Sequence, residues 1–318
     1  MTKRAAIALL TVALLPVACG STVTDPPSAT PGGSRPTASA SISARLTGAP
    51  DRPILGQTIA FTFDEVLYSS LGDGSDRTVL TDFPGPPYPY AGAFWSPSGD
   101  RLIIRVEEAP GTGKSGGYVF GVDADGSDLT NLSEVSGSHY DAMPGWSPDG
   151  SQIVYIAQKP GDALGQLYVM NADGTSPRKL IETDFEAQYP AWSSTGQIAF
   201  TGYRGGDFDI YTVQADGSRL TRVTKESTPE NWPTWSPDGS RMAFFASRDG
   251  TDGIWVMGAD GSNQRFLAEG GEPNWSPHGD EITFDCGDAQ SAIICAVRPD
   301  GGDPIQLFGD AGFPAVRP

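Results

Sequence analysis

The sequence predicts an all-β protein, a six-bladed β-propeller closed by pairing of its N- and C-terminal strands. Three observations indicate this fold: many glycines and prolines, a Trp-Ser motif that recurs five times, and half repeats at the two ends of the folded region. The 318 residues include 40 Gly and 27 Pro, well above the usual share of about 12% for the two together. Stretches without either residue are too short for helical bundles, so short strands remain.

The Trp-Ser motif marks a repeat of four predicted strands. It begins at Trp95, Trp146, Trp192, Trp235 and Trp275, with spacings of 51, 46, 43 and 40 residues. After each motif come a turn such as WSPDG, an apolar strand, a variable loop, a second strand that ends in an Asp-Gly turn, and a last short strand. Four strands at a period of about 40 residues are typical of a propeller blade.

The sixth blade is expected to combine both ends of residues 52–318. Residues 58–63, TIAFTF, match the second strand of a repeat, and residues 67–81 supply its third and fourth strands. The missing first strand is at the C-terminus, where residues 313–318 align with residues 272–277. Pairing of the two ends would close the ring and leave no open sheet edge along it.

Residues 1–18 have the pattern of an export signal. A short basic start with Lys3 and Arg4 precedes an apolar stretch that is too short to span a bilayer comfortably. The ending at residues 15–19, LPVAC, resembles the lipobox of bacterial lipoproteins, in which the Cys is lipidated and becomes the new N-terminus. Pro16 departs from that pattern, since an aliphatic residue is usual there. We expect lipidation of Cys19; cleavage as a plain secretory signal is the alternative.

Residues 19–51 are expected to form a disordered tether behind the lipidated Cys19. Of the 31 residues from Gly20 to Pro50, 25 are Ser, Thr, Pro, Gly or Ala, a composition that buries too little apolar surface to offset ordering entropy. The tether would hold the propeller of residues 52–318 away from the membrane. The expected location is therefore outside the cytoplasm, on the outer leaflet of the cell membrane or in the periplasm.

The overall charge restricts the partners. A formal net charge of −18 would repel nucleic acid and anionic lipid headgroups. We therefore expect no nucleic acid partner, and membrane contact only through the lipid. The chain is expected to be a monomer.

The repeat residues resemble those of the TolB propeller family. Its consensus runs Pro-x-Trp-Ser-Pro-Asp-Gly, then an Ile-Ala-Phe-like strand, then a strand that ends in Asn-Ala-Asp-Gly-Ser. The resemblance covers residues 56–318. It implies a propeller, but TolB itself has an α/β domain ahead of its propeller. Here the signal and the tether stand in that place, so the role of TolB in the envelope is not carried over.

Three motifs resemble functional sites but are read as structure. Residues 108–115, EAPGTGKS, look like a phosphate-binding loop, yet a strand follows them where a helix would be needed. Asp123 and Asp125 resemble the start of a calcium loop, but the following Gly is two places early, and the same Asp-Gly recurs as a hairpin turn. His278 takes the Asp position of a Ser-Pro-Asp-Gly turn, so we interpret this histidine as a structural residue. We therefore expect no cofactor, no metal and no catalytic residue.

The two cysteines that follow Cys19 form an even pair. Cys286 ends the second strand of blade six and Cys295 lies in its third strand. In an exported protein we expect a cross-strand disulfide; two buried free thiols are the alternative.

The candidate binding face surrounds one mouth of the central tunnel. The loops that enter first strands and those that leave second strands open on the same face, and they are the variable ones. The residue three places before each Trp, or before Val316 at the equivalent place in the C-terminal strand, is expected to form a ring there, namely Gly92, Met143, Tyr189, Trp232, Glu272 and Phe313. Entering loops add Tyr88, Tyr90, His139, Tyr140, Asp141, Glu186, Glu230 and Asn231, and the neighbouring loops add Arg204 and Arg248.

Aromatic side chains and arginines among acids are typical of binding hot spots. The leading hypothesis is therefore a module that binds a protein or peptide of the cell envelope, with a glycan as the alternative ligand. A second hypothesis is a metal-assisted hydrolase or lyase with its site at the tunnel mouth. A third is an extracellular scaffold without a small ligand. Packing of half of these side chains against each other would also account for their positions.

Overall fold

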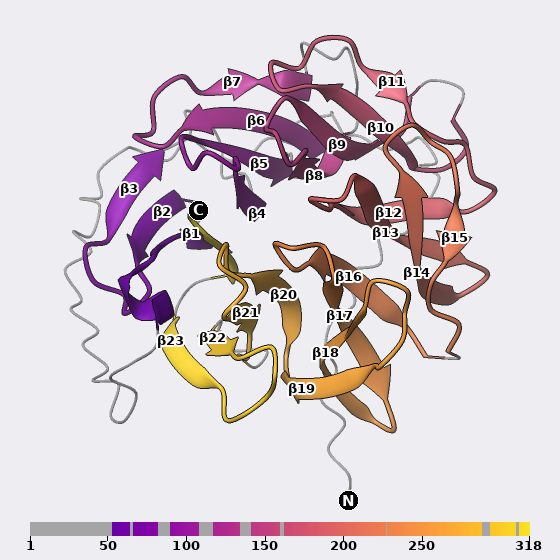
Figure 1. Ribbon diagram of the computed structural model, residues 1–318. Coiled ribbons are helices and arrows are strands. Elements are labelled where there is room, and N and C mark those ends of the chain that lie inside the picture. The colour runs from indigo at the N-terminus through magenta and orange to yellow at the C-terminus, as the bar shows by residue number, and fades with distance from the viewer. Residues whose placement is uncertain are drawn as a thin grey trace, which may run out of the picture. The chain divides into compact units, whose positions relative to one another are not determined.

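The computed structural model (Figure 1) describes residues 53–63, 66–81, 90–107, 117–133, 141–159, 162–226, 228–287, 293–309 and 312–318. The predicted signal peptide, Cys19 and the tether lie outside the described residues. Within the described part, no helix has the length and apolar character needed to cross a membrane.

The described residues form 24 strands and one short 3-10 helix, η1 (Pro53–Gly56). The strands are β1 (Thr58–Phe63), β2 (Val66–Leu71), β3 (Thr78–Thr81), β4 (Tyr90–Trp95), β5 (Arg101–Glu107), β6 (Gly117–Asp123), β7 (Thr130–Asn131), β8 (Asp141–Trp146), β9 (Gln152–Ala157), β10 (Gln166–Asn171), β11 (Arg178–Lys179), β12 (Glu186–Trp192), β13 (Gln197–Arg204), β14 (Asp207–Gln214), β15 (Thr221–Arg222), β16 (Glu230–Trp235), β17 (Arg241–Arg248), β18 (Thr251–Gly258), β19 (Arg265–Glu269), β20 (Gly271–Trp275), β21 (Ile282–Asp285), β22 (Ile293–Val297), β23 (Ile305–Gly309) and β24 (Gly312–Val316).

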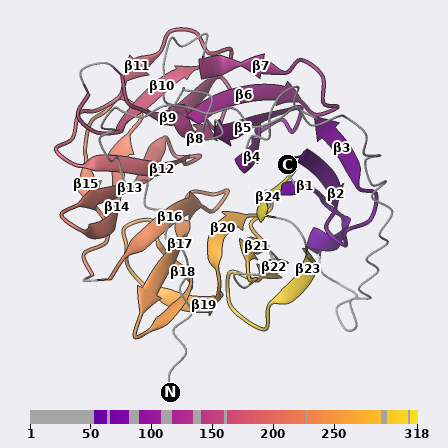
Figure 2. The ribbon, with the colours of Figure 1, turned by 180° about the vertical axis from the view of Figure 1, so that it is seen from behind.

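These strands make six antiparallel sheets of four strands each, which are the six predicted blades. Five blades use consecutive strands, from β4–β7 to β20–β23, while blade one has the order β24-β1-β2-β3. The innermost strands β24, β4, β8, β12, β16 and β20 each contact the next around the ring. Figures 1 and 2 show them around the centre, with the yellow C-terminal strand beside the indigo β1. The prediction of an all-β, six-bladed propeller is confirmed.

The two ends of the propeller meet in blade one. Strand β24 pairs with β1 through Ile59 opposite Val316 and Ala60 opposite Ala315. The Arg317 N–H also donates to the Thr58 carbonyl at 2.8 Å. The C-terminal segment therefore supplies the innermost strand that residues 53–81 lack, as the alignment of residues 313–318 predicts.

The hydrophobic core lies between neighbouring blades. Six apolar clusters fill the six interfaces of the ring, one between each pair of adjacent blades. The interface between blades six and one joins Ile294 and Leu307 to Ile59 and Val316. Because each central strand faces an interface on both sides, its middle residues are mostly apolar: in β9, every residue from Ile153 to Ala157 is buried.

The tryptophan of the Trp-Ser motif joins each blade to the one before it. Trp95, Trp146 and Trp235 are buried, and each indole N–H donates at 3.1 Å to a carbonyl on the innermost strand of the preceding blade. The acceptors are Ala315, Phe94 and Ala191, respectively. Val316 occupies the equivalent position in blade one and packs against blade six. The motif thus encodes the spacing between blades.

The recurrent turns are held by short polar contacts. In the Asp-Gly turns, the side chains of Asp125 and Asp173 accept the N–H of the residue two places on, and the glycines have a positive φ, 84° at Gly174. In the turn after Trp146, the Ser147 hydroxyl donates to Asp149 at 2.6 Å. This bond and those from Ser151 lower the pKa of Asp149 to about 2. The six Asp-Gly sites are therefore hairpin turns, and this end of the blades is a scaffold.

Removal of residues 312–318 should unfold the propeller cooperatively, because blade one would lose β24 and the two adjoining interfaces would lose Ala315 and Val316. Calorimetry checks this, with deletion of Pro318 alone as the control, since Pro318 lies beyond β24. A truncated chain that melts within a few degrees of the parent would contradict closure by the C-terminal strand.

Substitution Trp146→Ala should lower the free energy of unfolding by about 3–5 kcal/mol, because it leaves a cavity between blades two and three. Trp146→Phe keeps most of the apolar surface but loses the donor to the Phe94 carbonyl, so the loss should be about 1–2 kcal/mol. Denaturant unfolding measures both. A loss under about 1 kcal/mol for Trp146→Ala would contradict a position inside the interface.

Candidate functional site

The residues of the predicted ring lie at a bulge near the start of each innermost strand. In β4, β8, β12, β16 and β20, the register with the second strand shifts by one residue at this point. The five ring residues within these bulges have a positive φ: 95° at Gly92, 54° at Met143, 49° at Tyr189, 52° at Trp232 and 55° at Glu272. A bulge redirects the side chain of the inserted residue. The same backbone device therefore sets the direction of a different side chain in each blade.

Three ring residues, Met143, Tyr189 and Trp232, form a continuous half-buried surface over blades three to five. The Tyr189 N–H contacts the Met143 sulfur at 3.2 Å, and the Tyr189 and Trp232 rings meet edge to face at 5.4 Å between centroids. Phe245 supports Trp232 from the second strand, with centroids also 5.4 Å apart. A Cβ atom added at Gly271 would lie 3.6 Å from the Trp232 indole. Contacts among these residues thus run from Met143 in blade three to the backbone just before Glu272 in blade six.

Glu272 is the acidic member of the ring. Its side chain is half-buried as a whole, but its carboxyl is surrounded by protein. Loss of hydration, and to a lesser extent repulsion from Asp285, raises the pKa of Glu272 to about 8. Asp285 ends β21 directly opposite Gly271. The mouth therefore holds two neighbouring carboxyl groups beside an aromatic surface.

Glu230 and Arg248 form an internal ion pair. Glu230 is fully buried at the start of β16, and the Arg248 guanidinium donates to its carboxylate. Arg248 also donates to Gln264 at 2.5 Å and lies over the Trp255 ring at 4.3 Å. Burial raises the pKa of Glu230, while hydrogen bonds from Thr224 and Arg248 oppose that rise. The pair joins the strands of blade five, so neither charge is free for a ligand.

The remaining charged and polar candidates have local partners. Arg204 forms an exposed ion pair with Asp184 at 2.6 Å, at the rim of blade four. Glu186 accepts a hydrogen bond from Gln188 at 3.1 Å. The Asn231 side chain accepts the N–H of Trp232 at 3.1 Å and so supports the bulge. These residues frame the mouth, and their hydrogen bonds hold its edges.

Six candidates cannot be placed in full. Tyr88, His139 and Tyr140 lie outside the described residues, as do residues 108–116 with the phosphate-loop-like motif. Only the backbones of Tyr90, Asp141 and Phe313 are described, at or near the starts of β4, β8 and β24.

Metal-ligating side chains are dispersed. Over the described residues, no group of three or more His, Cys, Asp or Glu could hold a metal ion. His278 is exposed in the turn that follows Trp275, as expected for a structural turn residue.

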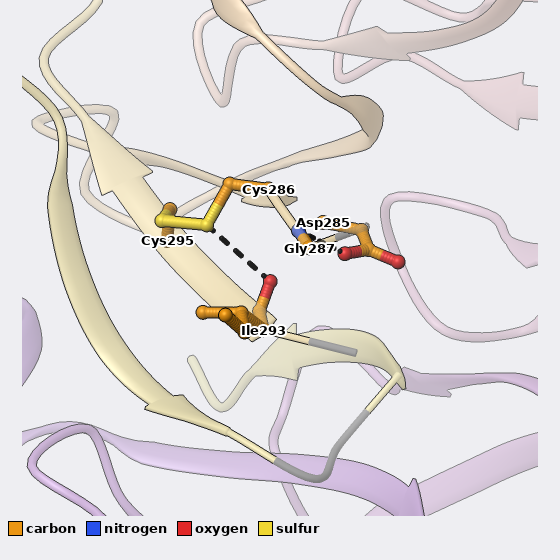
Figure 3. The surroundings of a disulfide bond; sticks show 5 residues. All are labelled: Asp285, Cys286, Gly287, Ile293 and Cys295. Carbon is orange, nitrogen blue, oxygen red and sulfur yellow. Dashed lines mark hydrogen bonds between the residues drawn. A yellow bond between two sulfur atoms is a disulfide. The ribbon is translucent and has the colours of Figure 1, made fainter. Parts of the chain in front are cut away.

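A disulfide joins Cys286 to Cys295 next to the acidic part of the mouth (Figure 3). The two Cα atoms are 5.8 Å apart, and the bridge links the end of β21 to β22. The Gly287 N–H donates to Asp285 at 2.9 Å. The disulfide and this turn hold the backbone directly after Asp285, where β21 ends opposite Gly271.

Sequence reasoning missed two features of the tunnel. Asp285 does not belong to the repeat pattern, and only the strand register brings it beside the mouth. At the opposite end of the tunnel, a cavity of about 260 Å³ lies between Trp95, Trp235, Trp275 and the C-terminal Pro318. Recurrence of Trp-Ser at equivalent blade positions was the signal that could have indicated this second opening.

Residues 187–310 match the family model of the TolB beta propeller domain. The chain carries a TolB-like β-propeller. A TolB homolog from Chlorobium luteolum is 30% identical over 131 residues, and an uncharacterized protein from Agrobacterium fabrum is 27% identical over 232 residues. These alignments cover 40% and 67% of this chain, and 29% and 74% of the relatives. The aligned part of this TolB-like chain thus spans less than a third of the TolB homolog.

The fold is also that of TolB from Acinetobacter baumannii, with a TM-score of 0.69 and 17% identity over 83% of this chain and 67% of that one. An oligogalacturonate lyase in complex with manganese has a similar propeller, with a TM-score of 0.54 and 15% identity over 79% of this chain and 73% of the lyase. The fold of the TolB-like propeller therefore does not decide between binding and catalysis.

Substitution Glu272→Gln should stabilise the propeller at high pH. A carboxyl with a pKa raised to about 8 in the folded chain reduces stability as the pH rises from its ordinary pKa toward 8, because the unfolded chain ionises first. The free energy of unfolding should increase by about 2 kcal/mol or more at pH 9 and by much less at pH 5. Denaturant unfolding at both pH values measures this, and an equal effect at both would contradict the desolvated carboxyl.

Proposed function

We propose that this protein is a lipid-anchored, extracytoplasmic TolB-like propeller that binds a protein or peptide of the cell envelope at the tunnel mouth. The observation that carries the proposal is the surface of Met143, Tyr189 and Trp232, three unlike residues from consecutive blades at one end of the tunnel. The Met143 sulfur accepts the Tyr189 N–H, and the Tyr189 and Trp232 rings meet edge to face.

The chemistry of this surface suits a protein ligand. Large aromatic side chains provide most of the energy at the centres of protein interfaces, and they lose little conformational freedom on binding. Tyr189 and Trp232 are already held by each other and by Phe245, so little further ordering is needed. Positive φ at non-glycine residues is itself costly and is often found at functional sites.

The location is inferred from the N-terminal sequence. Lys3 and Arg4 followed by an apolar stretch favour export, and the position of Cys19 favours lipidation. A disulfide between Cys286 and Cys295 is consistent with an oxidising compartment. We infer that the tether of residues 19–51 lets the mouth reach a partner while the lipid provides the only membrane contact.

Substitutions Trp232→Asn and Tyr189→Asn should each weaken binding of the partner by about 2 kcal/mol or more. Asparagine tolerates a positive φ better than alanine does, so the bulges should persist and circular dichroism should be unchanged. A photocrosslinking amino acid placed at Arg204, an exposed residue at the rim of the mouth, would capture the partner from envelope extract, and yields from each variant measure the effect.

The scaffold face supplies the control. Asp173→Asn and Asp260→Asn alter exposed Asp-Gly turns at the other end of the blades and should leave the crosslinking yield unchanged. If the turn variants lose the partner while the aromatic variants keep it, the functional face is the opposite one. Bound metal together with turnover of a substrate would favour a metal-assisted hydrolase or lyase instead.

A further inference from the structure

We propose that the mouth binds a lysine side chain of the partner, with the ammonium group beside the Glu272 carboxylate and the alkyl stem against the Trp232 indole. This inference rests on the proposed protein-binding function and specifies the chemistry of the partner.

The aromatic half of this site is already formed. The Trp232 indole lies against Gly271, the residue that precedes Glu272, and the Tyr189 ring meets the indole edge to face. Phe245 supports the same ring from β17. A tryptophan held in this way offers a surface to an alkyl chain and an electrostatic attraction to its ammonium group.

The acidic half lacks a cation from the protein itself. Two other buried carboxylates of blades four and five are paired with arginine: Glu230 with Arg248, and Asp209 with Arg222 at 2.7 Å. Among the described residues, no basic side chain forms an ion pair with Glu272 or Asp285. The N–H of Gly287 donates to Asp285, and no such bond reaches the Glu272 carboxyl from the described residues. The described residues therefore supply no cation to these two carboxyl groups, and a cation from a partner could fill this place.

The charges around Glu272 indicate how a cation would act. Of the groups on the elements packed against β20, Asp285 on β21 is the one that acts on Glu272, while Glu230 on β16 is already compensated by Arg248. Both loss of hydration and Asp285 disfavour the charged form of Glu272. A bound ammonium would favour that charged form, so lysine binding near pH 7.5 should release a proton.

The proposed lysine binding also explains why an acid that lowers the stability of the fold stands at position 272. An unpaired acid in a desolvated position reduces stability at neutral and higher pH, and a glutamine there would avoid this. Such a destabilising group is expected where binding requires it. A lysine suits this arrangement because its long alkyl stem packs on apolar surface such as the Trp232 indole, while its compact ammonium group can approach the neighbouring carboxyl groups of Glu272 and Asp285.

The test uses the full chain and two synthetic peptides, acetyl-Gly-Lys-Gly-amide and its norleucine analogue, which has the same alkyl stem without the ammonium group. Binding is followed by calorimetry at pH 8.5 and pH 6.5, in buffers of different ionisation enthalpy. We expect at least about a fivefold preference for the lysine peptide at pH 8.5, a smaller preference at pH 6.5, and proton release between these values.

Two variants separate the site from general charge. Glu272→Gln should abolish both the preference and the proton release, whereas Glu269→Gln removes the same charge from the exposed outer strand β19 and should keep them. Equal binding of the two peptides to the parent chain, failure of both to bind, or a preference that survives in Glu272→Gln would overturn the lysine site. If Trp232→Asn still lowers crosslinking in that case, the protein-binding function stands; if it does not, that function fails independently.

Discussion

The contact between neighbouring blades is the interaction on which the whole structure depends. A four-stranded sheet buries neither face alone, and here six apolar clusters cover the faces in pairs around the ring. Three indoles add direction to this non-directional force, because Trp95, Trp146 and Trp235 each donate a hydrogen bond to a backbone carbonyl of the preceding blade. Since every interface has two neighbours, the C-terminal strand β24 completes a cooperative unit.

The same ring brings unlike residues together. Each innermost strand carries its bulge at the equivalent position, so the bulged residues of all blades approach one mouth of the tunnel. Packing of the blades depends on the tryptophans and the turns at fixed positions, but it does not depend on which side chain the bulged residue carries. Met143, Tyr189, Trp232 and Glu272 differ in kind while their backbone conformations agree. A binding surface can therefore vary without change to the fold.

Electrostatics divide the acids of this strongly negative chain into two kinds. Acids in turns are held by hydroxyl and N–H donors, as Asp149 is by Ser147 and Ser151, which lowers its pKa to about 2. Glu272 has the opposite environment, since desolvation and Asp285 raise its pKa to about 8. The first kind stabilises hairpins, and the second lowers stability at the mouth. This contrast distinguishes a structural acid from one whose partner lies outside the chain.

The sequence by itself determined the blade count, the pairing of the chain ends, the hairpin turns and the ring positions, because each recurs at a fixed offset from Trp-Ser. The Cys286–Cys295 bridge was predicted because these two cysteines form an even pair on neighbouring strands of a chain expected to be exported. Only the tertiary structure decided that Glu230 and Arg248 neutralise each other, and that Asp285 lies beside Glu272. These relations depend on side-chain direction, burial and cross-strand register, which blade periodicity does not encode.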